Sequence, residues 1–234
     1  MSKTQLFLLH FAGGNSYSFQ FLLPFLQEFE VIPLELPGRG RRIREPLIRD
    51  FDEAAEDLFL QIRDRLNHDR FALYGHSMGA YLGLRIVAML EQVNKYPAWL
   101  FVSGNAGPGT LPKRNRYLFS KPDFIEELRR LGGVPAELLE NEDLLGFYLP
   151  IIRADFEIVE KEDRDTEPVI KTPVFVMMGN RETTVDKISN WSNFTSASFK
   201  QEIFDGGHFF IRQHAGRVAG IIKDVLSETE AVDL

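Results

Sequence analysis

The residue best placed to do chemistry in this chain is a serine held between two glycines. Phe71-Ala-Leu-Tyr-Gly75 is typical of a buried strand, Gly75-His-Ser-Met-Gly79 ends it, and apolar residues at helical spacing follow between positions 80 and 93. In such a turn the serine hydroxyl is exposed at the end of the strand, and glycines avoid the collisions that side chains would make. The pattern therefore predicts that Ser77 is a nucleophile and that the N–H of Met78 points to the oxygen of the carbonyl under attack.

A base for this serine is expected near the end of the chain. His208 follows a predicted strand at 199–204, in the glycine-flanked run Asp205-Gly-Gly-His208. Its rival is His10, which lies next to another glycine turn. Serine, acid and histidine follow one another in this order in α/β-hydrolases. We therefore expect His208 to take the Ser77 proton, return it to the leaving group and then activate water.

The acid of this group has two candidates. Glu182 stands three residues after Gly179, just beyond a predicted strand at 173–178. Asp186 lies four residues further on and has the shorter side chain. Either carboxylate would orient the imidazole and stabilise its cationic form, and the other would cap the next helix. The spacing favours Glu182 and leaves Asp186 as the alternative.

A second glycine turn follows the first predicted strand, Gln5 to Leu9. The run His10-Phe-Ala-Gly-Gly14 allows the backbone to turn tightly at that point. Taken alone, it would be a plain turn. In a hydrolase with a serine turn of this kind, the loop after an early core strand supplies the second oxyanion donor. We therefore expect the N–H of Phe11 or Ala12 to take that role.

The elements that must position these residues alternate between strand and helix. Further strands are predicted at 31–36 and 98–103, and Asp50 caps a helix whose apolar face runs from Phe51 to Leu66. An aromatic, helix-like stretch at 17–23 would cover the sheet. The alternation stops from 110 to 165, where a surplus of apolar residues predicts an inserted helical lid. We expect one α/β domain, with a core at 1–109 and 166–234 built on a mostly parallel sheet.

Composition narrows the function classes. The 234 residues are 44 % hydrophobic and 26 % charged, which is ordinary for one globular domain. The chain has no cysteine, and its five histidines show no paired metal spacing, so we expect no metal or other cofactor. A net charge of −7 argues against nucleic acid as the main partner. Without a signal-like or membrane-length apolar run, a cytoplasmic protein with no membrane partner is expected.

Basic residues are nevertheless concentrated in two places. Arg39, Arg41, Arg42 and Arg44 fall within six residues, and Lys113, Arg114 and Arg116 form a second group. Such runs are usually solvated loops. The functional alternative is the docking of an acidic or phosphate-bearing partner.

Several motifs together resemble one family, the type II thioesterases that accompany polyketide and nonribosomal peptide synthetases. The likeness covers nearly the whole chain. It rests on His10-Phe-Ala-Gly-Gly14, Leu36-Pro-Gly-Arg-Gly40 with Arg42 and Glu45-Pro46, Gly75-His-Ser-Met-Gly79, Leu131-Gly-Gly-Val-Pro-Ala136, Leu149-Pro-Ile-Ile-Arg-Ala-Asp155 and Gly206-Gly-His208.

The resemblance implies hydrolysis of acyl groups from the phosphopantetheine arm of acyl or peptidyl carrier proteins, which clears misprimed or stalled units. Ser77 and His208 match the family's nucleophile and base, and Met78 with the loop at 10–12 matches its oxyanion donors. Two positions depart from the family pattern. The chain has His10 where proline is usual, and Glu182 where aspartate is usual, which leaves the identity of the acid open.

Two other functions are compatible with the same residues. A carboxylesterase or lipase acting on small molecules would use the same serine, histidine and acid, because this group does not distinguish oxygen esters from thioesters. A catalytically inactive hydrolase fold that serves as a binding module is a different class. The intact serine, histidine and carboxylate argue against it.

Overall fold

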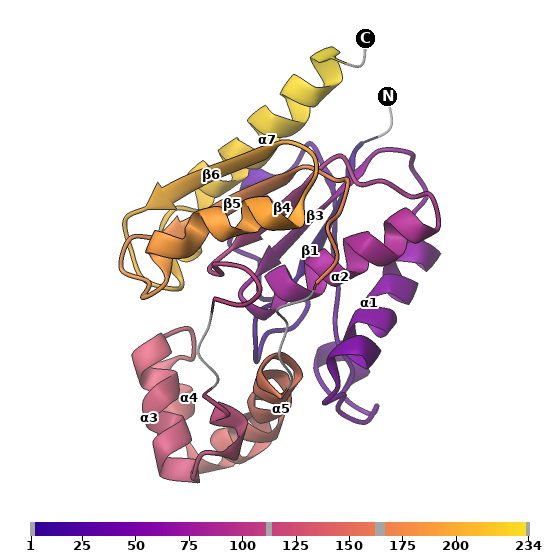
Figure 1. The fold of residues 1–234 in the computed structure, drawn as a ribbon. Coiled ribbons are helices and arrows are strands. Elements are labelled where there is room, and N and C mark those ends of the chain that lie inside the picture. The colour runs from indigo at the N-terminus through magenta and orange to yellow at the C-terminus, as the bar shows by residue number, and fades with distance from the viewer. Residues whose placement is uncertain (1–2, 111–113, 162–166, 233–234) are drawn as a thin grey trace.

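A parallel sheet forms the centre of the molecule (Figure 1). The computed structural model describes residues 3–110, 114–161 and 167–232. Its six-stranded sheet has the order β2-β1-β3-β4-β5-β6, and every neighbouring pair is parallel. The predicted α/β class is therefore confirmed. The strands are β1 (Gln5–Leu9), β2 (Glu30–Pro33), β3 (Phe71–His76), β4 (Leu100–Ser103), β5 (Val174–Gly179) and β6 (Phe199–Phe204).

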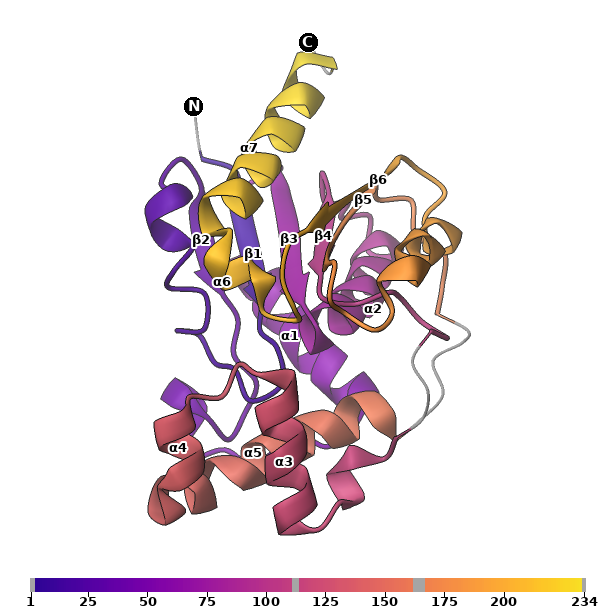
Figure 2. The same ribbon diagram turned by 90° about the vertical axis from the view of Figure 1, so that its left-hand side faces the viewer.

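Helices cover both faces of this sheet because alternate strand residues are apolar on both sides (Figure 2). In β1, Phe7 and Leu9 pack in one cluster with α1 and α2, whereas Leu6 and Leu8 pack in another with α6 and α7. The sheet is therefore buried between two layers. These helices are α1 (Phe51–Arg65), α2 (Met78–Gln92), α6 (Phe210–Gln213) and α7 (Ala215–Val232).

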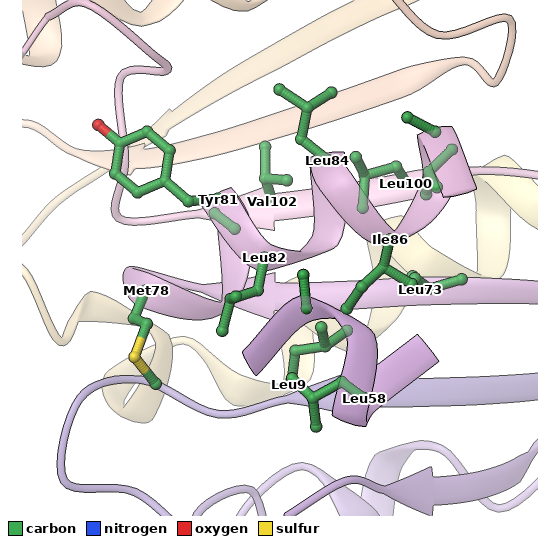
Figure 3. Packing of buried hydrophobic residues seen from close by; sticks show 14 of the residues in the cluster. Leu9, Leu58, Leu73, Met78, Tyr81, Leu82, Leu84, Ile86, Leu100 and Val102 are labelled. Atoms are coloured by element: carbon green, nitrogen blue, oxygen red, sulfur yellow. The ribbon is translucent and has the colours of Figure 1, made fainter. Parts of the chain in front are cut away.

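The first of these clusters fixes the strand that leads to the serine. Figure 3 shows Ile86 of α2 between Leu100 of β4 and Leu73 of β3, with Leu58 of α1 nearby. All four side chains are at most 2 % exposed. Burying one such side chain contributes roughly 1.5–3 kcal/mol. The junction of β3 and α2 is therefore held by side chains that are almost completely buried.

Three further helices, α3 (Lys121–Leu131), α4 (Ala136–Glu140) and α5 (Glu142–Glu160), lie beyond the carboxyl ends of the strands (Figures 1 and 2). They form their own hydrophobic cluster, in which Phe124 packs edge-on against Phe156. The Ser120 hydroxyl caps α3, and the Asn141 side chain caps α5. Phe147 remains 51 % exposed, so the segment does not bury all of its apolar residues.

Several local predictions can be compared with the structure. Asp50 accepts the N–H groups of Asp52 and Glu53, as expected of the cap of α1. The stretch 17–23 forms successive turns, and only a 3-10 helix, η1 (Leu23–Phe25), follows it. Strand β2 ends at Pro33 rather than at Leu36, although the Leu34 N–H still donates to the Leu8 carbonyl oxygen of β1. The helix expected after the two candidate acids is a 3-10 helix, η4 (Val185–Phe194).

Candidate active site

Ser77 occupies a strained backbone position between β3 and α2. Its φ and ψ are 57° and −112°, a region that non-glycine residues rarely adopt. A Cβ on Gly75 would lie 2.1 Å from the Gly79 carbonyl oxygen, and a Cβ on Gly79 would lie 2.2 Å from the Leu9 carbonyl oxygen. Both flanking positions therefore require glycine. The strain is retained because the packed strand and helix on either side determine the turn.

A chain of hydrogen bonds links the serine to a histidine and a carboxylate. His208 Nε2 lies 3.0 Å from Ser77 Oγ, and His208 Nδ1 lies 2.7 Å from Glu182 Oε2. The other Glu182 oxygen accepts the N–H of Gly179 at 2.9 Å, which fixes the carboxylate. With the proton on Nδ1, His208 donates to Glu182 and its Nε2 is free to accept the serine proton.

The two candidate acids have different surroundings. The Glu182 side chain is 8 % exposed and faces His208. Asp186 is exposed in the first turn of η4. Within the described ranges, the carboxylate bonded to His208 is that of Glu182. The geometry thus favours Glu182 over Asp186 as the acid.

The predicted oxyanion donors, Met78, Phe11 and Ala12, line the same cavity as Ser77. The N–H of Met78 starts α2, and the loop after β1 runs alongside because Gly79 lies against the carbonyl oxygens of Leu9 and His10. In the part of the chain that the structure describes, neither Met78 N–H nor Ala12 N–H donates to a protein acceptor. Free N–H groups at a helix start are suited to bind a developing oxyanion.

Two further histidines near the site are held neutral. Burial and the nearby His208 lower the pKa of His76 well below 6.5, and its ring centroid lies 5.0 Å from that of His208. Burial, with the neighbouring Arg39 cation, lowers the pKa of His10 to about 4. His10 Nδ1 lies 2.9 Å from the Phe11 carbonyl oxygen, and its Nε2 accepts the N–H of Leu36. Both ring nitrogens of His10 are thus engaged by backbone groups of Phe11 and Leu36, and they do not contact Ser77.

A cavity of about 770 Å³ opens between the strand ends and the helices α3 to α5. Ser77, Met78 and His208 lie in its wall. Much of the remaining lining is apolar: Phe11, Tyr81, Leu128, Leu131, Val134, Leu138, Tyr148, Ile152, Phe156 and Phe209. A site of this size and character suits a ligand with an extended apolar part. Phe209 is absent from the sequence prediction, although its position next to His208 was a signal that it would reach the site.

The arginine cluster does not form one surface. Arg39 is 3 % exposed and makes a two-pronged ion pair with Asp155, so the prediction that it docks a partner is wrong. The Arg42 guanidinium is engaged by Glu45 and Asp57, which raise its pKa. The side chains of Arg41 and Arg44 are exposed.

The second basic group is also largely paired. Arg114 and Arg116 both lie close to Glu127, and Arg116 also bonds Glu160. Lys113 lies outside the described residues. Because these arginines already have carboxylate partners, less of their positive charge is available to an acidic protein.

The residues at 3–110, 114–161 and 167–232 offer neither a metal site nor a membrane-spanning helix. Among these residues, no group of three or more His, Cys, Asp or Glu side chains could hold a metal ion. A helix long and apolar enough to cross a membrane is likewise not found there.

Comparison with known proteins places the chain in a family. The thioesterase domain model matches residues 4–226. Thioesterase PikA5 of Streptomyces venezuelae is 29 % identical over 97 % of this chain and 83 % of its own length. The gramicidin S biosynthesis protein GrsT of Aneurinibacillus migulanus is 30 % identical over 90 % of this chain and 84 % of its own length.

Solved structures agree with the sequence relatives. ClbQ from the colibactin NRPS/PKS pathway is 26 % identical, with a TM-score of 0.90 over 99 % of this chain and 100 % of that one. The type II thioesterase BorB from the borrelidin biosynthetic cluster is 30 % identical, with a TM-score of 0.86 over 96 % of this chain and 93 % of that one. Because the family model spans almost the whole chain, the protein belongs to the thioesterase family and is a hydrolase that acts on thioesters.

Proposed function

We propose that this thioesterase removes acyl groups from the phosphopantetheine arm of acyl or peptidyl carrier proteins, and so clears misprimed or stalled units from a synthetase. The observation that carries the proposal is the hydrogen-bonded series Ser77, His208 and Glu182 at the wall of an apolar cavity. Relatives named for gramicidin S biosynthesis and for the colibactin NRPS/PKS pathway support the choice of substrate.

The proposed chemistry proceeds in two steps. Ser77 Oγ attacks the thioester carbonyl while His208 Nε2 takes the hydroxyl proton, and Glu182 stabilises the resulting imidazolium. The N–H groups of Met78 and Ala12 hold the oxyanion. The tetrahedral intermediate collapses, the C–S bond breaks, and His208 returns the proton to the departing thiolate. Water, deprotonated by His208, then cleaves the acyl–serine ester and restores the enzyme.

The segment 110–165 is proposed to act as the lid of this site. Leu128 of α3 and both Ile152 and Phe156 of α5 line the cavity opposite the serine, so the acyl chain would lie between the lid and the sheet. Such an arrangement keeps water away from the thioester until the thiol has left. The lid would then influence which acyl groups are accepted.

Carrier proteins are typically acidic, and the exposed pair Arg41 and Arg44 is proposed to meet one. Neither residue is part of the buried Arg39 ion pair. The proposal is restricted to these two arginines, because Arg42 already has two carboxylate partners.

A panel of substrates tests the proposal. The same acyl groups are offered as carrier-bound thioesters, as small N-acetylcysteamine thioesters and as oxygen esters, and products are followed by mass spectrometry. We expect the highest kcat/KM for carrier thioesters, with a KM that rises with salt for the carrier substrate alone. Ser77→Ala serves as the blank. Equal kcat/KM for oxygen esters and carrier thioesters would instead favour a small-molecule carboxylesterase.

A further inference from the structure

A buried ion pair connects the lid to the core beneath the first glycine loop. The Arg39 and Asp155 side chains are 3 % and 0 % exposed, and their two hydrogen bonds measure 2.6 and 2.7 Å. Taking two charges out of water offsets most of their attraction, so such a pair adds little to stability compared with apolar residues of similar size. Its contacts with the rest of the protein therefore indicate what it does.

Both members of the pair also bind the loop at 10–14. Asp155 Oδ2 accepts the N–H of Gly13 at 2.7 Å, and Arg39 Nη1 donates to the Gly14 carbonyl oxygen at 3.3 Å. Gly13 has a φ of +78°, and a Cβ there would lie 2.8 Å from Cγ1 of Ile152, one turn before Asp155 on α5. The N–H of Gly14 closes the turn on the Phe11 carbonyl oxygen at 2.8 Å.

These contacts determine where the Ala12 N–H points. The peptide group before Ala12 is fixed by the hydrogen bond to the Phe11 carbonyl oxygen, and the peptide group after it by the Gly13 N–H bond to Asp155. We propose that Arg39 and Asp155 are positioning residues that aim the second oxyanion donor. This inference rests on the proposed function, in which Ala12 N–H binds the oxyanion. It also links two parts of the site, because α5 lines the acyl cavity through Ile152 while it holds the loop through Asp155.

The test replaces the pair by apolar residues. The double variant R39M/D155L removes both loop contacts and leaves neither member of the pair buried without its partner, so it should fold. The matched control is R42M/D57L, which removes another two-pronged Arg–Asp pair that does not contact the loop. Both are assayed in the full chain with an octanoyl N-acetylcysteamine thioester, which avoids any effect of carrier docking.

We expect kcat of R39M/D155L to fall about 10- to 100-fold, less than or equal to the loss of one whole oxyanion donor, with KM changed by less than about threefold. Serine adds to the carbonyl of an alkyl trifluoromethyl ketone and forms a hemiketal oxyanion. This inhibitor should therefore bind more weakly by the same factor. A non-electrophilic alkyl thioether should bind as before. The control should retain kcat within about twofold.

Arg39→Lys provides a second variant if the double variant does not fold. It keeps a cation opposite Asp155, but a single ammonium does not reproduce the planar fork that reaches both Asp155 and Gly14. We expect a loss of about 3- to 10-fold in kcat, with the thioether again unaffected.

A kcat within twofold of wild type in the folded double variant would overturn the inference, as would an equal loss in the control. Equal weakening of ketone and thioether would overturn it too. The proposed function fails separately, if the wild-type protein does not hydrolyse the thioester at all.

Discussion

Glu182 is set toward His208 by a short turn of its own backbone. The N–H of Glu182 donates to the Gly179 carbonyl oxygen, and the Gly179 N–H donates back to the Glu182 carboxylate. This reciprocal pair places the longer glutamate side chain at 2.7 Å from the imidazole. Spacing along the sequence does not show which way a carboxylate turns, so it left Glu182 and Asp186 open, whereas the turn at Gly179 favours Glu182.

His10 should make the stability of the protein depend on pH. Its pKa falls from 6.5 to about 4 on folding, because burial disfavours the charged ring. Unfolded chains then bind more protons than folded ones between these values, so this contribution is complete above about pH 6.5 and is lost as the pH falls toward 4. From pH 7 to pH 5, wild type should lose about 2 kcal/mol more in free energy of unfolding than His10→Gln.

Urea unfolding of both proteins at the two pH values measures this difference. Carboxylates and His76 titrate in both proteins, so their contributions cancel in the comparison. An identical loss in the two proteins would show that His10 is not buried as a neutral ring.

The turn between β3 and α2 is the element on which the site depends. A Cβ on Gly79 would meet the backbone of β1 at Leu9, which cannot move without moving the loop at 10–14. Gly79→Ala should therefore lower the free energy of unfolding by about 1–3 kcal/mol, as overpacking does. Because α2 would be pushed away from β1, kcat should also fall at least about tenfold.

Gly220→Ala is the matched control for that substitution. Gly220 lies inside α7, and a Cβ there would meet nothing within 4 Å. The variant should gain up to about 1 kcal/mol from helix propensity and keep its kcat. Chemical unfolding together with thioester assays on both variants checks the prediction, which fails if the two alanines behave alike.

Elements with a strong pattern could be predicted from the sequence, and the others could not. In β1, β3 and α1, the apolar residues that the local pattern places on the core side are buried in the structure. The stretch 17–23 has an aromatic pattern like that of a helix, yet it folds as turns that bury Phe19 and Leu22 and leave Tyr17 exposed. There, tertiary contacts with the sheet outweighed local periodicity.

At the scale of the whole molecule, long-range pairing decides what a charged residue does. Arg39 looked like one of four surface arginines because its partner Asp155 lies 116 residues further along the chain. Ser77, Glu182 and His208 are also far apart in sequence, but the fold brings them together because β3, β5 and β6 end at one edge of a parallel sheet. Motif order is enough to predict the second case and not the first.

The helices α3 to α5 lie over that edge and form one side of the site. The cavity lies between these helices and the strand ends, and both contribute to its apolar wall. The proposed mechanism therefore requires an acyl group to be held there while it is bound to Ser77. This intermediate is the most direct consequence of the proposed chemistry.

Mass spectrometry of the intact protein, quenched in acid within the first turnovers of an acyl-carrier thioester, tests the central claim. We predict a fraction of the protein heavier by one acyl group, with peptide mapping placing the acyl group on Ser77, and its absence in Ser77→Ala. Glu182→Gln should form the adduct more slowly, because the imidazolium loses its counter-charge. Hydrolysis of the thioester at the wild-type rate by Ser77→Ala, or an acyl group on another residue, would contradict the account.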